Sequence, residues 1–375
     1  MKIRIPVAEP EFGETELRYV TDCVTSGWIS SLGPYVNRFE TLLAHFCGVK
    51  HAIAVANGTV ALHLGLVAAR IGKGDEVIVP DMTFVATGNV VHHAGATPVL
   101  VDVDAATWNI SPRAIEAAIT RRTKAIIPVH LYGYPCDMEA IGAIAKRHKL
   151  LVIEDAAEAL GAELNGRPAG SFGDIASFSF YANKTLTTGE GGLCTTNDDR
   201  LAARMRFLRD HAMSPKRRYY HPEIGYNYRL TALQAAFGTA QAERLPDLIE
   251  KKQRIAAMYR EQLAGIPGLT LPPQRPEARS SYWMFSVLIG RAFGRSRDEL
   301  AIELRARGIE TRPFFMPLHK MPPYKTPRRF PVATRLGREG LSLPSATRLT
   351  AAQVQEVADA IRDLSAVSRS RRRAS

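Results

Sequence analysis

The chain has 375 residues, of which 46% are hydrophobic and 23% are charged, and its formal net charge is +12. This is ordinary globular composition, and the length suits two or three domains. No apolar stretch approaches the ~20 residues of a membrane-spanning helix, and the first residues lack the apolar core of a secretory signal. The four cysteines have no metal-type spacing, so we expect no metal site and a reducing, cytoplasmic location.

Part of the positive charge gathers at the C-terminus, where residues 368–375 include four arginines. We expect this basic tail to be disordered. Without it the net charge is still +8, spread over helices and over the loop at 214–220. A basic surface suits a small anionic substrate as well as nucleic acid, and no nucleic-acid-binding signature is found, so we expect no nucleic-acid partner.

Short apolar runs alternate with helical patterns between residues 51 and 197. Strands are predicted at 51–57, 76–80, 97–103, 124–130, 150–155, 174–180 and 191–197, and helices at 59–72, 111–119 and 137–148. Short continuous apolar strands between helices are typical of a mostly parallel sheet that is covered on both faces. The sequence therefore predicts an open α/β domain.

The pattern changes after about residue 231. Helices are predicted at 230–245 and 247–264, followed by proline-rich loops, a strand at 282–290, a helix at 296–308, a strand at 309–314 and a final helix at 350–364. This order indicates a second, smaller α/β unit. We predict a large domain over 1–245, a small C-terminal domain over 246–367 and the basic tail over 368–375.

Three features fall at the carboxyl ends of predicted strands, where ligands bind in open α/β sheets. Gly58 and Thr59 open a helix whose free N–H groups suit a phosphate, although an N-capping threonine explains the pair equally well. Asp155 ends the fifth strand and could hold a metal, a ribose or a protonated ring nitrogen, or cap a helix. Lys184 follows apolar strand residues and has Glu190 as its only nearby carboxylate in the sequence, which argues against an ordinary surface lysine.

Together these groups suit one chemistry. A cofactor with an aldehyde, a pyridine ring and a phosphate needs a lysine for a Schiff base, a carboxylate for the ring nitrogen and a helix N-terminus for the phosphate. Pyridoxal 5′-phosphate (PLP) is such a cofactor. In a desolvated site, Lys184 would have a lowered pKa and act as a nucleophile and then as a base, while Asp155 would keep the ring nitrogen protonated.

A string of motifs carries a resemblance over nearly the whole chain. The motifs are GWISSLGPYV, NGTVALHL, DEVIVP, PVHLYG, VIEDAAEALGA, SFSFYANKTLTTGEGG, GYNYRLTALQAA and LPS at 343–345. With them the chain resembles the DegT/DnrJ/EryC1/StrS family of nucleotide-sugar aminotransferases, which are fold-type I PLP enzymes. The local strings WISSLG, HLYGYPCDM, RRYYHPEIGYNYR and ETRPFFMPLHKMPPY are similar to the branch that makes GDP-perosamine.

The resemblance implies a set of cofactor contacts. Those residues are Lys184 for the Schiff base, Asp155 for the ring nitrogen, Gly58, Thr59 and Ser179 for the phosphate, Phe84 for stacking on the ring, Glu158 beside the ring hydroxyl, and Asn227 for the phosphate of a neighbouring subunit. A core phenylalanine and a turn asparagine are the alternatives for Phe84 and Asn227. Many family members carry glutamine where this chain has Glu158, and the glutamate favours the GDP-perosamine branch. The role of Asn227 implies a homodimer with shared active sites.

The resemblance also implies substrate contacts. It places Trp28, Ile29, Ser30 and Ser31 on a loop near the sugar. Arg229 and the basic loop Lys216–Arg218 are candidates for the diphosphate, because guanidinium groups pair well with phosphate oxygens, although a solvated basic face explains the loop equally well. His319 is a candidate for the sugar pocket, with a structural histidine as the alternative.

The implied activity is transfer of an amino group from L-glutamate to a 4-keto-6-deoxy nucleotide sugar, with GDP-4-keto-6-deoxymannose giving GDP-perosamine. A different keto nucleotide sugar, with a 3-amino product or a dTDP or UDP carrier, is an alternative. Related 3-dehydratases carry histidine in place of the lysine, so Lys184 argues against that chemistry. A cofactor-binding regulator of DNA would need an added DNA-binding module, and the sequence offers none.

Overall fold

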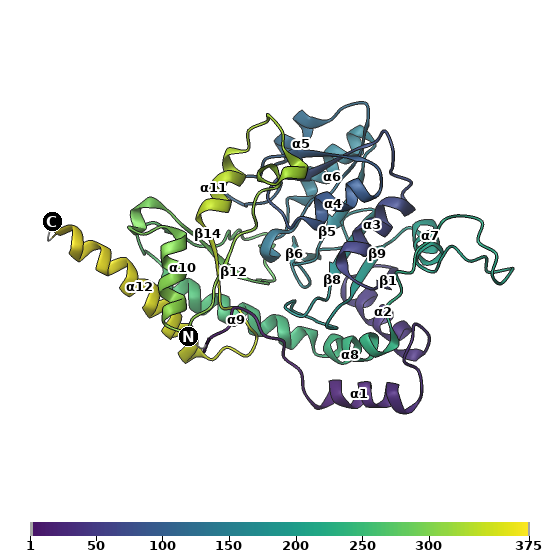
Figure 1. Cartoon of the computed structure of the whole chain (residues 1–375), viewed down its shortest axis with the longest axis horizontal. Coiled ribbons are helices and arrows are strands. Elements are labelled where there is room, and N and C mark those ends of the chain that lie inside the picture. Colours follow the sequence, from purple (N-terminus) through teal and green to yellow (C-terminus); the bar gives the residue numbers. More distant parts are fainter. Residues whose placement is uncertain (1–2, 374–375) are drawn as a thin grey trace.

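The computed structural model describes the backbone of residues 3–373 and the side chains of residues 3–365 (Figure 1). The large sheet contains β1 (His51–Val55), β2 (Glu76–Pro80), β3 (Thr97–Val101), β4 (Thr123–Ile126), β5 (Leu151–Asp155), β8 (Ile175–Ser179) and β9 (Gly192–Thr196). Its strand order is β1-β9-β8-β5-β4-β2-β3. The predicted α/β class and mostly parallel sheet are confirmed, because the pairs from β8 to β3 are all parallel.

Strand β9 departs from the parallel pattern and pairs antiparallel with both β1 and β8. A parallel crossover between neighbouring strands needs a dozen or more residues and usually a helix. The connection from β8 to β9 contains no helix and returns directly, so β8 and β9 form a hairpin. This hairpin loop carries Lys184.

Helices cover both faces of the large sheet, because its strands are apolar on both sides. The helices are α1 (Glu14–Thr25), α2 (Pro34–Phe46), α3 (Gly58–Ala68), α4 (Ala86–His93), α5 (Pro112–Ala118), α6 (Met138–His148), α7 (Asp199–Arg209) and α8 (Ala232–Glu243). Successive residues of β1 point to opposite faces: Ile53 packs in the core beneath α3, and Ala54 packs in the core beneath α2 and α8. Helix α1 packs on α8, away from the sheet.

A second, antiparallel sheet lies beside the first, in the order β10-β12-β14-β13. Its strands are β10 (Leu269–Thr270), β12 (Phe285–Ile289), β13 (Arg312–Pro313) and β14 (Gly340–Leu343), and its helices are α9 (Leu245–Leu263), α10 (Arg297–Ala306), α11 (Pro331–Glu339) and α12 (Ala351–Arg373). The short strands β6 (Glu163–Leu164), β7 (Arg167–Pro168) and β11 (Ala278–Arg279) form a third sheet. Short 3-10 helices lie at Leu131–Gly133, Arg291–Phe293, Leu318–Lys320 and Pro322–Tyr324.

The N-terminal segment belongs to the second sheet in space. Ile5 forms a bridge with Ile309, the Val7 N–H donates to Glu310 Oε2 at 2.9 Å, and the Val7 carbonyl accepts from Ser345 N at 2.9 Å. The chain then crosses to α1 beneath the large sheet (Figure 1). The proposed division into 1–245 and 246–367 stays a prediction. The tail is expected to be disordered from residue 368, whereas the backbone of α12 continues to Arg373; the side chains of 366–375 lie outside the described residues. No helix in the described part of the chain is long and apolar enough to cross a membrane.

Candidate active site

A cavity of about 680 Å³ lies at the carboxyl ends of β5 and β8, between the two larger sheets. The large sheet contributes Asp155 and Ser179 to its wall, and the hairpin loop contributes Lys184. Trp283 and Arg312, next to or within strands of the second sheet, close the other side. Residues far apart in the sequence therefore meet at one edge of the sheet, as expected for ligand sites in this class.

Lys184 reaches into this cavity with a side chain that is 12% exposed. Its backbone N–H donates to the carbonyl of Tyr181 at 2.9 Å, which fixes the turn after β8. Its Nζ lies 3.9 Å from Glu158 Oε1 and 3.7 Å from the centroid of the Trp283 ring. Burial lowers the pKa of Lys184, against the opposing effect of the nearby carboxylates, so the neutral, nucleophilic amine becomes more accessible.

Asp155 ends β5 beneath the cavity and is almost fully buried. Its Oδ2 accepts from Thr87 Oγ1 at 2.8 Å, and its Oδ1 accepts from Ala157 N at 3.2 Å. Burial raises the pKa of Asp155, while these two donors and the charge of Lys184 oppose the rise. The carboxylate is thus held in a fixed orientation where it can partner a cationic ring nitrogen. Its bond to Ala157 N also resembles a turn cap, so the capping alternative requires the experiment given in the Discussion.

Glu158 lies on the same wall, with Oε2 accepting from Tyr132 N at 2.7 Å. Burial raises the pKa of Glu158 to about 7, opposed mainly by the charge of Lys184. Near neutral pH this carboxyl is therefore poised to hold or release a proton. The Glu158 carboxyl is a suitable hydrogen-bond partner for a hydroxyl on the ring of a bound cofactor.

The N-terminus of α3 forms the far end of the cavity. Asn57, not Thr59, is the N-cap, because its side chain accepts from Val60 N at 3.0 Å. The N–H groups of Gly58 and Thr59 find no acceptor in the described part of the chain and face the cavity end lined also by Ser179. Two free N–H groups at a helix start and a hydroxyl are the groups that suit a phosphate.

Gly58 is required by close packing at this end. A Cβ at this position would lie 2.8 Å from the Cβ of Ser179, closer than real side chains approach. The helix start therefore sits directly against the end of β8. With Lys184, Asp155 and this phosphate-binding end in one cavity, the residues present fit PLP.

Phe84 also lines the cavity, and it is 54% exposed. Its ring centroid lies 5.5 Å from that of Phe315. A core role does not suit so exposed a ring, whereas an aromatic face beside the cavity suits stacking on a cofactor ring.

Other predicted residues lie outside this cavity in the single chain. The loop with Trp28, Ile29, Ser30 and Ser31 is mostly exposed, and the Ser30 carbonyl accepts from Ala232 N. Arg229 pairs with Asp210, and Asn227 is exposed and bridges to the same aspartate through the backbone. The loop Lys216–Arg218 is exposed, and Arg217 and Arg218 lie over the rings of Tyr220 and Tyr219. None of these residues is among the described residues that line the cavity, so their roles stay predictions.

His319 is held by the large sheet. Its Nδ1 lies 2.6 Å from Asp81 Oδ2, its N–H donates to Asp81 Oδ1 at 2.8 Å, and its ring stacks on Phe330. These contacts suit the structural alternative, and His319 is not among the described residues that line the cavity.

Sequence reasoning missed Trp283, Arg312 and Thr87. Trp283 and Arg312 fall within predicted strands. Which of their residues face the cavity depends on how β12 and β13 pair with β14, and β14 was not predicted. Thr87 lies in α4, a short helix also absent from the prediction. The predicted strand at 309–314 also contains Glu310 and Thr311, so the sequence alone did not single out Arg312.

Comparison with known proteins identifies the family of the chain. A model of the DegT/DnrJ/EryC1/StrS aminotransferase family matches residues 10–362. The GDP-perosamine synthase of Caulobacter vibrioides is 50% identical over 361 residues, covering 96% of this chain and 97% of that protein. The GDP-perosamine synthase of Escherichia coli O157:H7 is 44% identical over 360 residues, covering 96% of this chain and 98% of that protein. The structure of DesI with its TDP-sugar product has a TM-score of 0.90 and 34% identity, covering 99% of this chain and 96% of that chain.

The cofactor follows from the family, whose solved structures include PLP and PMP forms. The family model spans nearly the whole chain, and the curated relatives share up to half of its residues. The chain therefore belongs to the DegT/DnrJ/EryC1/StrS family of PLP-dependent aminotransferases.

Proposed function

We propose that the protein transfers an amino group from L-glutamate to GDP-4-keto-6-deoxymannose and forms GDP-perosamine. The observation that carries the proposal is the meeting of Lys184, Asp155, Glu158 and the α3 N-terminus in one cavity. The names of relatives 50% and 44% identical support the choice of sugar. We further propose a cytoplasmic location, because all four cysteines are free and buried.

Bound PLP would supply an aldehyde that accepts the amino group and a ring that withdraws electrons from the reacting carbon. Lys184 would hold the aldehyde, Asp155 would hold a proton on the ring nitrogen, and Gly58, Thr59 and Ser179 would hold the phosphate. Once released, Lys184 Nζ would remove the proton from Cα of glutamate. In the second half of the reaction the same amine would deliver a proton to C4 of the sugar.

Arg312 supports an amino donor that carries a carboxylate. Apart from Lys184, it is the one lysine or arginine among the described residues lining the cavity, and it forms no ion pair within the described chain. Asp155, Glu158 and Glu190 line the same space, so a further carboxylate entering it needs a compensating cation. A guanidinium can bind a carboxylate through two parallel hydrogen bonds.

We expect Arg312→Gln to lower kcat/KM for glutamate by ~100-fold, the loss of one strong charge-assisted hydrogen bond. The amino-acid half of the reaction should be followed spectroscopically without sugar, and the sugar half with enzyme already loaded with the amino group. The sugar half should change little. Arg338→Gln is the matched control, because Arg338 is a 67% exposed side chain paired with Glu339. A loss confined to the sugar half would assign Arg312 to the nucleotide sugar instead.

We expect kcat/KM for GDP-4-keto-6-deoxymannose to exceed that for dTDP-4-keto-6-deoxyglucose by at least ~100-fold, about 2.7 kcal/mol. All these nucleotides present the same diphosphate, so the base must be distinguished by pocket shape and hydrogen bonds. Products should be identified by mass spectrometry and NMR, with the amine expected at C4. Efficient turnover of the dTDP sugar, or an amine at C3, would place the protein in another branch and leave the roles of Lys184 and Asp155 unchanged.

We propose a homodimer in which Asn227 of one subunit completes the phosphate site of the other. Its exposure, outside the cavity of its own chain, supports this role. Mixing Lys184→Ala with Asn227→Ala subunits should restore part of the activity, because each hybrid dimer would contain one intact site. Asn227→Ala must first be shown to be inactive alone. Absence of recovery after verified subunit exchange would assign both residues to the site of a single chain.

A further inference from the structure

Lys252, in α9, is a lysine that is 4% exposed and has no carboxylate partner in the described part of the chain. Its Nζ donates to the carbonyl of Trp283 at 3.0 Å and to the carbonyl of Ser345. Burial lowers the pKa of Lys252 from 10.5 to about 7. An apolar side chain would fill this space without the cost of desolvating an amine. The advantage of a lysine at this position is therefore its two hydrogen bonds.

The two carbonyls lie at the same end of the β12–β14 pair. The last paired residues are Phe285 and Leu343, and Trp283 and Ser345 lie two positions beyond them. The ladder between the strands has ended there, and a buried carbonyl without a donor costs ~1–3 kcal/mol. Lys252 therefore joins two strand ends of the second sheet to α9 through one amine.

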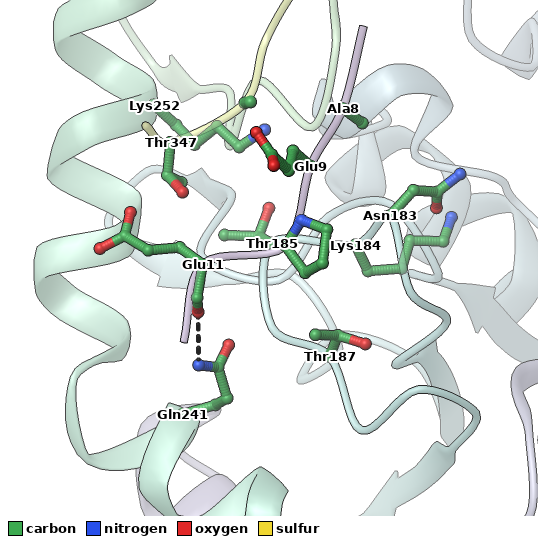
Figure 2. A pocket seen from close by; sticks show the side chains of 12 residues that line it. Ala8, Glu9, Glu11, Asn183, Lys184, Thr185, Thr187, Gln241, Lys252 and Thr347 are labelled. Carbon is green, nitrogen blue, oxygen red and sulfur yellow. Dashed lines mark hydrogen bonds between the residues drawn. The ribbon is translucent and has the colours of Figure 1, made fainter. Parts of the chain in front are cut away.

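Trp283 connects this junction to the active site. Its Nε1 donates to the carbonyl of Asn183 at 2.9 Å, and its ring centroid lies 3.7 Å from Lys184 Nζ. The ring also stacks on Tyr132, with centroids 6.1 Å apart and planes at 9°. Figure 2 shows a second, small pocket that Lys252 and Lys184 both line, with the N-terminal segment between them in this view. Lys252 is not among the described residues that line the active-site cavity, so it is a neighbour of that site.

We propose that Lys252 is a positioning residue: by holding the Trp283 carbonyl it keeps the indole face against Lys184 Nζ and so sets how firmly Lys184 holds a proton. An indole face stabilises a cation in contact with it. The largest charge effects on Lys184 come from Glu158, Asp155 and Arg312, and we assign the effect of Lys252 to the ring that it positions. The inference rests on the proposed role of Lys184, which must both hold and release a proton during turnover.

The test uses the full-length protein without cofactor. The rate at which acetic anhydride labels Lys184 is measured against pH by peptide mass spectrometry, which gives the pKa of Lys184 directly. Lys252→Met should lower the pKa of Lys184 by about 1, since a desolvated contact with an indole contributes energy of that order. In the loaded enzyme kcat should fall ~10-fold with little change in KM for the sugar. Lys252→Arg, which keeps the donors, should restore both values.

Lys251→Met is the matched control, because Lys251 is the neighbouring residue of α9 but pairs with carboxylates, Glu11 at 2.7 Å and Asp247 at 3.0 Å. This variant should leave the labelling of Lys184 unchanged. Trp283→Leu should lower the pKa of Lys184 as Lys252→Met does, and adding Lys252→Met to it should cause no further change.

An unchanged pKa of Lys184 in Trp283→Leu overturns the proposal, even where Lys252→Met fails to fold. Additive effects of the two substitutions also overturn it, since they would act independently. Labelling reports on Lys184 without any substrate. A wild-type protein that labels as expected but aminates no sugar would therefore contradict the proposed function and leave the positioning by Lys252 standing.

Discussion

Lys184→Ala is expected to abolish turnover while leaving the fold intact. The side chain makes no short ion pair, since Glu158 Oε1 is 3.9 Å from Nζ. Its removal therefore takes away the cost of burying an amine and leaves the backbone bonds of the hairpin in place. The turn is held instead by backbone bonds, such as Phe180 N to Gly191 O at 2.8 Å. Loss of the amine that binds the cofactor and moves the protons should cost at least ~10⁴ in kcat.

Borohydride reduction of the wild-type holoenzyme should fix the cofactor covalently to residue 184, as read by peptide mapping. Lys146→Ala, an exposed lysine in α6, is the control and should retain both turnover and trapping. Circular dichroism and thermal unfolding check that the alanine variant is folded. An adduct found on a different lysine would contradict the assignment.

Asp155→Asn should reduce kcat by ~10²–10³, several kcal/mol in the barrier, because it removes the charge that holds a proton on the ring nitrogen. The change keeps the shape of the side chain. Its Oδ1 can still accept from Ala157 N, and Thr87 Oγ1 can turn from donor to acceptor for the new amide. We therefore expect normal folding, measured by thermal unfolding, beside the catalytic loss.

The control for Asp155→Asn is Asp137→Asn. Asp137 is an ordinary N-cap, whose side chain accepts from Ala140 N at 3.0 Å in α6. Asparagine caps a helix about as well as aspartate, so this change should alter neither stability nor turnover. Near-normal kcat in Asp155→Asn would mean that Asp155, too, acts only as a cap.

Local signals in the sequence predicted the large sheet well. The apolar runs at β2, β4 and β5 are short, continuous and each preceded by a predicted helix, so they indicate buried parallel strands by themselves. The direction of β9 was not predictable in this way, because its residues are equally apolar in either orientation. The decisive feature is that the connection after β8 contains no helix and returns directly to pair with β8.

Site residues could be predicted where they directly follow a recognisable strand. They could not be predicted where segments distant in the sequence are brought together by packing. Asp155 and Lys184 each follow a recognisable strand, and the cavity contains both. Arg312 lines it only because β13 pairs with β14, and His319 is held by Asp81, 238 residues earlier in the chain. Such pairings depend on packing and leave no local pattern in the sequence.

The place of Val7 has a consequence for synthesis on the ribosome. Its partners, Glu310 and Ser345, are made more than 300 residues later, so this segment emerges early and is placed late. Domains generally fold as their chains emerge, and the large sheet can assemble meanwhile from β1 to β9. The second sheet must wait for both ends of the chain. A bulky fusion directly ahead of Ile5 would therefore interfere with the final step of folding, whereas the same fusion placed after α12 would not meet this segment.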